Sequence, residues 1–375
     1  MFASFFLAGF EGTTAVNRHG EWIDQIAATQ HDRFADDDYR LLREVGIAAA
    51  RDAVRWPLVD RAGRYDWSSL DPLLGAARRH GVDVVWDLFH FGYPAGADPF
   101  ADGFAERFAE YCWAAGRHVA RETPGRCWFT PVNEPSYFAW AAGDAGLFAP
   151  HQRGAGYDLK KQLARAAIAG IDALRSACPQ AGIVNVDAIC RVTAPPGDAA
   201  LQRAADDFNE HVVFQSYDML AGRLHPELGG SREHLGAIGI NYYWTNQWDL
   251  AQPGVPLLDT DPRHVPLREI VRNVWKRYGG DVLVTETSHV GELRPGWLRA
   301  VAEEAEALLR ERVPLRGVCL YPILGMPEWH ERGVWARMGL WDLVPQSPTL
   351  ARLPYAPMLE ALRDAQRLEG FAARA

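Results

Sequence analysis

The sequence has few cysteines, and their spacing matches neither a disulfide framework nor a metal site. Only five occur in 375 residues, an odd number at wide spacing (Cys112, Cys127, Cys178, Cys190 and Cys319). This pattern predicts reduced thiols in a cytoplasmic protein. The 12 histidines lack His-Glu-x-x-His or a comparable ligand spacing, and no Gly-x-Gly-x-x-Gly segment occurs. We therefore expect no metal ion, no dinucleotide and no other cofactor.

Long hydrophobic runs are also missing. No stretch of about 18 uninterrupted apolar residues is present, which argues against a helix that spans a membrane. The opening segment 1–10 is apolar, but it has no basic leader and Glu11 follows it directly. A first buried strand explains this segment better than a secretion signal does.

Positive charge is in deficit. The 39 lysines and arginines are outnumbered by 48 aspartates and glutamates, which gives a formal net charge of −9. Nucleic acids and anionic membranes need a positive surface, so neither is an expected partner. A small neutral molecule fits this charge better. The sequence makes no prediction about the oligomeric state.

Hydrophobic residues are abundant and recur in short runs. They make up 48% of the sequence, with 14 Trp, 12 Tyr and 16 Phe, and the runs alternate with amphipathic segments along the whole chain. Such alternation is typical of parallel strands that are each followed by a helix. Eight such units in a chain of this length predict a (β/α)8 TIM barrel, with residues 1–375 forming one domain.

The expected elements can be placed by residue number. Strands are expected near 3–10, 47–54, 82–88, 126–132, 182–188, 236–243, 281–286 and 316–322, and helices near 34–45, 68–79, 103–121, 158–177, 206–221, 264–277, 296–311 and 356–368. Ser68 is expected to cap a helix start, while Gly46, Gly81 and Gly279 follow helix ends where a left-handed residue is favoured. The longest irregular stretches, 10–33, 244–263 and 323–354, are expected over the carboxyl ends of the strands, where barrel active sites lie.

Two glutamates follow apolar runs at predicted strand ends. Glu134 lies in Thr-Pro-Val-Asn-Glu-Pro (130–135) and Glu286 in Val-Leu-Val-Thr-Glu-Thr (282–287). Glycoside cleavage needs such a pair, and a retaining enzyme holds the two carboxyl groups roughly 5 to 5.5 Å apart. Taken alone, Asn-Glu-Pro is equally consistent with a loop turn. A surface position for Glu286 is disfavoured, because this residue directly follows an apolar run and the end of such a strand should point into the barrel mouth.

Further segments occur in a matching order along nearly the whole chain. They are Asp32-Arg-Phe, Arg-Asp-Ala-Val-Arg-Trp-Pro (51–57), Leu-Phe-His-Phe-Gly-Tyr-Pro (88–94), Gly-Ile-Asn-Tyr-Tyr (239–243), Glu-Trp (328–329) and Arg-Met-Gly-Leu (337–340). Together with the two glutamates they resemble clan A glycoside hydrolases, most closely the family 1 β-glycosidases. The sequence departs from that family at Thr287 and Ser288 after the second glutamate, at Tyr321 where a tryptophan is common, and at Met326-Pro327. It therefore resembles a divergent and shortened member, and Glu11 near the first strand receives no assigned role.

The resemblance implies a retaining mechanism. Glu134 would be the general acid/base and Glu286 the nucleophile that forms a covalent glycosyl-enzyme. An acid must keep its proton and a nucleophile must stay ionised, so a cation is expected beside Glu286, and Arg51 is the candidate. Tyr243 resembles a tyrosine that donates to the nucleophile, although a core tyrosine is the alternative. Asn241 shares its inward face because strand side chains alternate.

The remaining candidates would bind the sugar. By resemblance, Asn133 bonds the 2-hydroxyl, His90 and Glu328 bond other hydroxyls, and Trp329 stacks on the sugar face. Tyr321 is a further candidate for the substrate site. A packed core histidine is the alternative reading of His90.

The expected substrate is a β-glycoside or short oligosaccharide with an unphosphorylated hexose of gluco or galacto type. Glu328 would place a carboxylate beside any 6-phosphate, which is unfavourable in a partly dry site. Transglycosylation at the same site and a non-catalytic sugar-binding barrel are the alternatives, since a fold alone never certifies activity.

Overall fold

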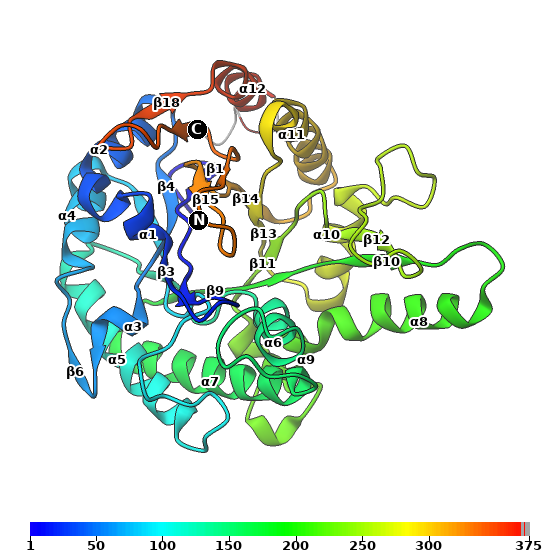
Figure 1. Cartoon of the computed structure of the whole chain (residues 1–375), viewed down its shortest axis with the longest axis horizontal. Helices are drawn as coiled ribbons and strands as arrows, with labels where there is room; N and C mark the ends of the chain where they lie inside the picture. The colour runs from blue at the N-terminus through cyan, green and yellow to red at the C-terminus, as the bar shows by residue number, and fades with distance from the viewer. Residues whose placement is uncertain (369–370, 372–375) are drawn as a thin grey trace.

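Eight parallel strands close into a barrel in the part of the chain that this computed structural model describes, residues 1–368 and 371 (Figure 1). They are β1 (Phe6–Gly9), β4 (Ala49–Ala53), β7 (Asp83–Asp87), β8 (Trp128–Thr130), β9 (Gly182–Ala188), β11 (Ala237–Asn241), β13 (Val282–Thr287) and β14 (Leu315–Leu320). Each strand pairs with its sequence neighbours in the barrel, and β14 pairs with β1 to close it. The predicted (β/α)8 fold is confirmed; residues 369, 370 and 372–375 of the predicted domain lie outside the described residues.

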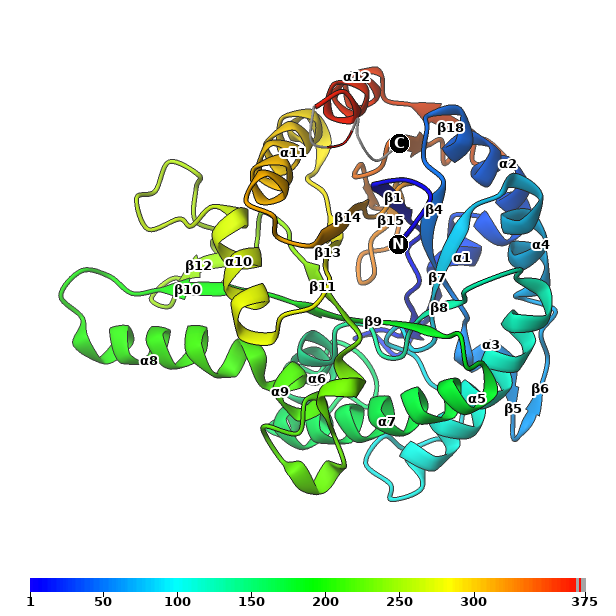
Figure 2. The same cartoon turned by 180° about the vertical axis from the view of Figure 1, so that it is seen from behind.

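Helices surround this barrel, as Figure 2 shows from behind. The expected helices correspond to α2 (His31–Glu44), α4 (Asp71–His80), α5 (Phe104–Glu122), α7 (Gly156–Ala177), α10 (Leu267–Tyr278), α11 (Arg294–Arg310) and α12 (Ala356–Gln366). The left-handed glycines occur as predicted, with φ of 76° at Gly46, 60° at Gly81 and 66° at Gly279. The predicted cap at Ser68 is wrong. Leu70 precedes the first helical residue, and the Ser68 N–H is bound to Asp66 instead.

The single helix predicted over 206–221 is also wrong. The segment contains the end of α8 (Ala199–Glu210), a short 3-10 turn (Val212–Phe214) and α9 (Gln215–Leu220). Asp198 caps α8 by accepting from the N–H groups of Ala200 and Leu201. In α8 Ala205 is the one fully buried residue, and the helix extends away from the barrel in Figure 1. The apolar spacing of 206–221 therefore spans two differently packed helices.

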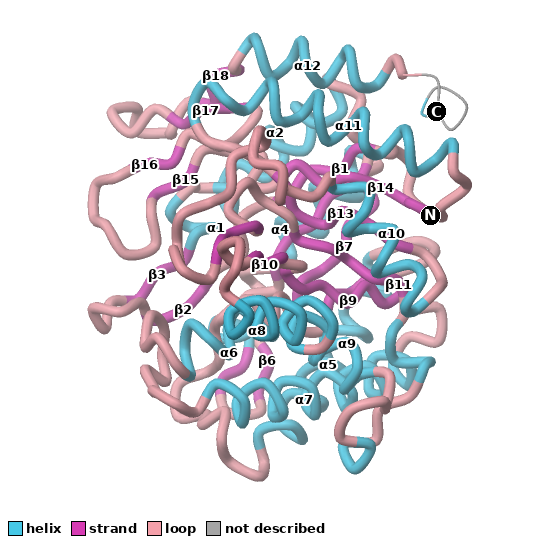
Figure 3. The backbone as a smooth tube through the Cα atoms, turned by 90° about the vertical axis from the view of Figure 1, so that its right-hand side faces the viewer, coloured by secondary structure: helices cyan, strands magenta, loops and turns pink. Residues whose placement is uncertain are grey.

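The predicted irregular stretches contain short strands, which pair with one another or, in the case of β12 (Gln247–Asp249), with β10 (Arg191–Thr193) outside these stretches. The other pairs are β2 (Thr14–Val16) with β3 (Trp22–Asp24), β15 (Met326–Pro327) with β16 (Trp335–Ala336), and β17 (Trp341–Leu343) with β18 (Arg352–Pro354). In Figure 3, β2, β3, β15 and β16 lie at the end of the molecule opposite the N-terminus. They stand beyond the carboxyl ends of the barrel strands, where the barrel carries its functional loops.

The barrel interior is apolar toward the amino ends of its strands. Val85, Trp128, Val184, Val186, Ala237 and Leu283 form one buried cluster inside it. Toward the carboxyl ends this filling gives way to buried polar side chains, among them Arg51, Asp87 and Glu286. The polar layer therefore lies under the loops at the carboxyl ends of the strands, not at their amino ends.

A bulge in β13 shapes this polar layer. The pairing register with β11 shifts between Ile240 and Asn241, so Asn241 lies opposite Glu286 rather than Thr285. A bulge adds one residue and re-aims side chains near functional sites. As a result both Thr285 and Glu286 make contacts within the polar layer, although strict alternation would place them on opposite faces.

Two further observations concern the described residues as a set. All five cysteines are free thiols, and four of them are buried. None of the described helices combines the length and apolar character needed to cross a membrane.

Candidate active site

Arg51 lies at the centre of the polar layer. Its side chain is 1% exposed, and its guanidinium donates to Oε1 of Glu286 at 2.9 Å, to Oδ2 of Asp87 at 2.7 Å and to Oδ1 of Asn133 at 2.9 Å. A fourth bond reaches the carbonyl oxygen of Thr285 at 2.8 Å. One buried cation thus lies between two buried carboxylates, which is the pairing that buried charges require.

Glu286 is held by donors on both carboxylate oxygens. Arg51 binds Oε1, and the Tyr243 hydroxyl donates to Oε2 at 2.8 Å. Burial raises the pKa of the Glu286 carboxyl, while the charges of Arg51 and His90 and the Tyr243 hydrogen bond act in the opposite direction. These partners favour the ionised form of this carboxyl.

Glu134 lies four residues beyond the end of β8 and two beyond the predicted strand 126–132, and Asn133 beside it still forms a parallel bridge with Val186 of β9. Glu134 is the residue before helix α6 (Pro135–Gly143), with a left-handed backbone at φ 45° and ψ 60°. Its N–H binds the carbonyl of Val186 at 3.0 Å, and Asn241 donates to its Oε1 at 2.8 Å. Burial, followed by the charge of Glu286, raises the pKa of Glu134 well above its ordinary value.

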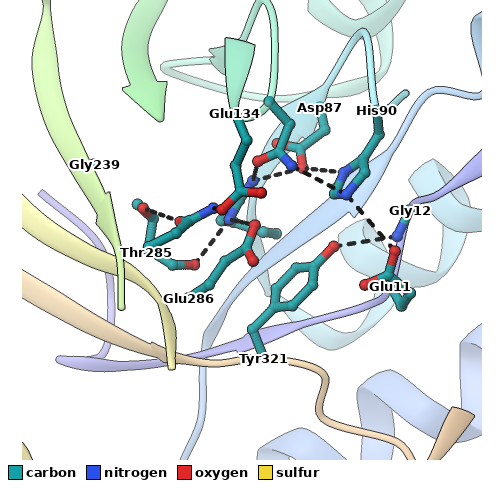
Figure 4. Close-up of polar contacts among 12 residues, drawn as sticks. Glu11, Gly12, Asp87, His90, Glu134, Gly239, Thr285, Glu286 and Tyr321 are labelled. Carbon is teal, nitrogen blue, oxygen red and sulfur yellow. Dashed lines mark hydrogen bonds and ion pairs between the residues drawn. The ribbon is translucent and has the colours of Figure 1, made fainter. Parts of the chain in front are cut away.

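The two carboxyl groups are turned toward one another in Figure 4. Of the two, Glu286 has a cation and a phenol as donors, whereas Glu134 has the neutral amide of Asn241. A proton shared by this pair is therefore favoured on Glu134, and the negative charge on Glu286. Two carboxyl groups whose surroundings separate their protonation in this way can serve as an acid and a nucleophile or base.

His90 connects two partners of Arg51, Asp87 and Asn133, to Glu11, which follows β1. Its Nδ1 lies 3.1 Å from Oδ2 of Asp87, and its Nε2 lies 3.1 Å from Nδ2 of Asn133 and 3.7 Å from Oε1 of Glu11. Because the Arg51 guanidinium binds Oδ1 of Asn133, the amide nitrogen of that side chain faces His90 and donates to Nε2. In this neutral form the ring proton lies on Nδ1 and is donated to Asp87. Burial opposes the charged form of the ring, but Asp87 and Glu11 raise the pKa of His90.

Tyr321 packs beneath these groups. Its ring lies 5.2 Å from the guanidinium carbon of Arg51, and its hydroxyl accepts the N–H of Gly12 at 3.2 Å. A Cβ at Gly9 would come within 1.8 Å of the ring, so this position of the tyrosine requires glycine there. Tyr321 is 1% exposed and closes one side of the site (Figure 4).

Glu328 and Trp329 lie on the loop after β14. Glu328 is exposed, and its N–H binds the carbonyl of Val334. Trp329 contacts Phe91 and Tyr137, with ring centroids 6.0 and 6.3 Å away. Burial, followed by the charges of Glu134, Glu11 and Glu328, raises the pKa of Tyr137.

All ten predicted site residues therefore lie in one region, eight of them in the buried polar network and Glu328 and Trp329 at its rim. Sequence reasoning missed Asp87, Thr285 and Tyr137. Asp87 ends β7 three residues before His90, a spacing that could have drawn attention to it. Thr285 directly precedes Glu286 and donates to Oδ1 of Asn241 at 2.8 Å. The described residues contain no group of three or more His, Cys, Asp or Glu side chains that could hold a metal ion.

Comparison with known proteins gives a match in structure alone. The sequence matches no protein-family model and no curated protein. Solved structures that match include the β-glucosidase from Thermotoga maritima in complex with noeuromycin, at 19% identity over 96% of this chain and 91% of that chain, with a TM-score of 0.74. The same enzyme in complex with galacto-hydroximolactam matches at 20% identity over 96% of this chain and 92% of that chain, with a TM-score of 0.74. The AHE enzyme from Alicyclobacillus herbarius matches over 100% of this chain and 98% of its own, at 18% identity and a TM-score of 0.79. At these identities the likeness shows a shared fold.

Proposed function

We propose that this protein is a retaining β-glycosidase of a divergent, shortened family 1 type. It would hydrolyse a small β-hexoside or short oligosaccharide through a covalent glycosyl-enzyme. The observation that carries the proposal is the contrast between the two buried glutamates, because Glu286 is paired with Arg51 and Tyr243 while Glu134 is bound by a neutral amide. The β-glucosidases with the same fold support it.

In the first step, Oε1 or Oε2 of Glu286 attacks the anomeric carbon and the glycosidic C–O bond breaks. Glu134 gives its proton to the departing oxygen, so that the leaving group departs as an alcohol. Arg51 and Tyr243 keep the nucleophile ionised and oriented before the attack. In the second step Glu134, now ionised, takes a proton from water as that water displaces Glu286 from the sugar.

The sugar would lie against a wall of hydrogen-bonding groups. Asn133, His90, Asn241 and Glu328 are proposed to bind hydroxyls, and Tyr321 and Trp329 to pack against the ring. The amide of Asn133 is committed to Arg51 and His90, which fixes its orientation before substrate arrives. A hydrogen bond to the sugar 2-hydroxyl from this position would strengthen in the transition state.

An unphosphorylated gluco or galacto sugar is proposed because the nearby cations are committed elsewhere. Arg332 is 84% exposed and paired with Glu21, and Arg337 is 62% exposed and paired with Asp342. Glu328 adds negative charge at the same rim. A 6-phosphate would therefore lie beside the Glu328 carboxylate, while Arg332 and Arg337 are already paired with other carboxylates.

Two wider features complete the proposal. The chain is proposed to work as one catalytic domain in the cytoplasm, a location that its five free cysteines favour. Transglycosylation would use the same intermediate, with an acceptor hydroxyl in place of water. A non-catalytic barrel is disfavoured, because sugar binding alone gives no reason to keep a buried cation beside one glutamate.

A substrate panel tests the proposal. Purified protein is assayed against aryl β-glucoside, β-galactoside and other aryl β-glycosides, with aryl 6-phospho-β-glucoside as the competing class. Glu286→Gly should abolish turnover, and azide or formate should partly restore it with inverted product, because the small anion fills the vacated space. No turnover on the whole panel would contradict the proposal, and preference for the phosphorylated sugar would contradict its substrate class.

A further inference from the structure

Asp187 is a fully buried carboxylate that the proposed reaction steps leave without a role. It lies on β9 and is 0% exposed. Val184 and Val186 point into the barrel, so alternation directs Asp187 outward, toward the surrounding helices. Its partners agree with this direction, because they belong to α6 and α9.

The carboxylate caps the helix that Glu134 precedes. The N–H of Ser136, in the first turn of α6, lies 3.3 Å from both oxygens of Asp187. The residue before a helix commonly uses its own side chain to satisfy such an N–H group. Glu134 makes no side-chain cap, since its carboxyl is bound by Asn241 on the other side. Asp187 thus supplies from β9 the cap that Glu134 does not.

The remaining partners of Asp187 are neutral. The Ser216 hydroxyl on α9 donates to Oδ2, and the N–H of Ala188 donates to Oδ1 at 2.9 Å. Lys160 on α7 acts on Asp187 electrostatically, but its ammonium is bound to Gln215 at 2.9 Å. Within the described residues no cation lies within ion-pair distance of Asp187. Burial raises the pKa of its carboxyl, while the hydrogen bonds from Ser136, Ser216 and Ala188 and the charge of Lys160 favour the ionised form.

We propose that Asp187 is a positioning residue for Glu134, holding its left-handed turn through Ser136 and placing a negative charge behind it that keeps its proton in place. This inference rests on the proposed function, because it gives Asp187 a role toward the proposed acid. Glu134 would then lie between two carboxylates, Glu286 in front and Asp187 behind.

Several other titratable groups surround this pair. Arg51 on β4 opposes protonation of Glu134, while Glu286 on β13 and Asp187 on β9 favour it. The groups whose own pKa values are raised by the charge of Glu134 are Tyr137, Cys190, Tyr217 and Tyr243. All four are neutral near pH 7, so Asp187 is the group whose replacement removes a formal charge without touching the proposed sugar site.

The test follows the protonation of Glu134 in two ways, by an infrared titration that needs no turnover and by the pH dependence of catalysis. Asp187→Asn keeps the shape and removes the charge. In infrared difference titrations, the protonated-carboxyl band of Glu134 is identified as the band that is absent in Glu134→Gln. The titration midpoint of this band should move to lower pH by roughly half a unit in Asp187→Asn. The alkaline limb of kcat/KM for an aryl β-glycoside should move in the same direction. Asp218→Asn is the matched control, since Asp218 is a buried carboxylate on α9 that is held by Arg277 and Tyr278.

The outcomes separate this inference from the proposed function. An unchanged midpoint in Asp187→Asn, or a rate loss that is equal at every pH, would overturn the positioning role. Wild-type protein without glycosidase activity would overturn the proposed function, while the infrared titration would still test Asp187. Thermal unfolding shows whether each variant folds, and Asp187→Ser, which also lacks the charge, carries the same expectation if Asp187→Asn does not fold.

Discussion

The hydroxyl of Tyr243 donates a 2.8 Å hydrogen bond to Oε2 of Glu286. The guanidinium of Arg51 occupies the other oxygen, so the carboxylate is restrained at both ends. Preorganised donors of this kind cost no rearrangement when charge moves during a reaction. The relationship gives the first of four predictions.

Replacing Tyr243 by Phe should lower kcat/KM for an aryl β-glucoside roughly 10- to 100-fold, the range that a lost hydrogen bond to a charged group gives. The hydrogen bond opposes the rise in the pKa of Glu286, so its loss should also move the acid limb of the pH profile upward. Tyr242→Phe is the control. Tyr242 is buried on the other side of the strand end, where its hydroxyl accepts from Gln247. An equal effect of both changes would contradict the assignment.

Replacing Glu134 by Ala should slow substrates with poor leaving groups far more than substrates with activated ones. An activated phenol departs without help, whereas an alkyl alcohol or sugar needs the proton. General acid catalysis contributes typically 10²- to 10⁴-fold, so the rate ratio between the two substrate types should widen by about that amount. A series of aryl glycosides of increasing leaving-group pKa measures this dependence. A uniform rate loss across the series would remove Glu134 from the acid role.

The sequence predicts the barrel well because its signals are local. Apolar runs recur in every unit, glycines follow the ends of three helices, and the alternation in 241–243 directs Asn241 and Tyr243 to one side. The bulge at Thr285 and the cap from Asp187 to Ser136 have no local signal, because each depends on a neighbouring strand. Asp87 was missed although it lies three residues before His90 in the sequence. An aspartate at a strand end looks exposed in sequence, and only the closed barrel places it against Arg51.

A buried network around His31 predicts how stability depends on pH. His31 lies between Asp38 at 2.8 Å and Asp52 at 3.0 Å, and although burial opposes its charge, these carboxylates raise its pKa from 6.5 to about 9. The folded state therefore binds this proton more tightly than the unfolded state. The resulting stability is fully present below pH 6.5 and is lost as the pH rises through about 9, with a size on the order of 3 kcal/mol.

Thermal unfolding between pH 6 and 10 checks this expectation. The melting temperature of the wild-type protein should fall across the window from 6.5 to about 9. His31→Gln should be less stable at pH 6 and should lose less further stability across the same window. A parallel fall in both proteins would show that other groups control the alkaline transition.

Aromatic rings lead outward from Glu134 along α6. Tyr137 contacts Trp329 on one side and Trp140 on the other, with ring centroids 6.3 and 5.8 Å away, and Trp140 is 51% exposed. If Glu134 delivers its proton to the leaving group, as proposed, that group should lie on the Glu134 side and reach these rings. Exposed aromatic faces of this kind offer flat stacking surfaces.

Trp140→Ala should therefore raise KM for aryl and disaccharide substrates by roughly 3- to 10-fold, as expected for a partly exposed aromatic contact of about 0.5 to 1.5 kcal/mol. The KM of a methyl β-glycoside, whose leaving group is too small to reach Trp140, should change little. Trp113→Ala is the matched control, since Trp113 is 42% exposed on α5 and packs under Arg117. Steady-state kinetics on the aryl, disaccharide and methyl substrates test whether Trp140 contacts the leaving group. An equal rise in KM for the methyl glycoside would place Trp140 outside the leaving-group side of the site.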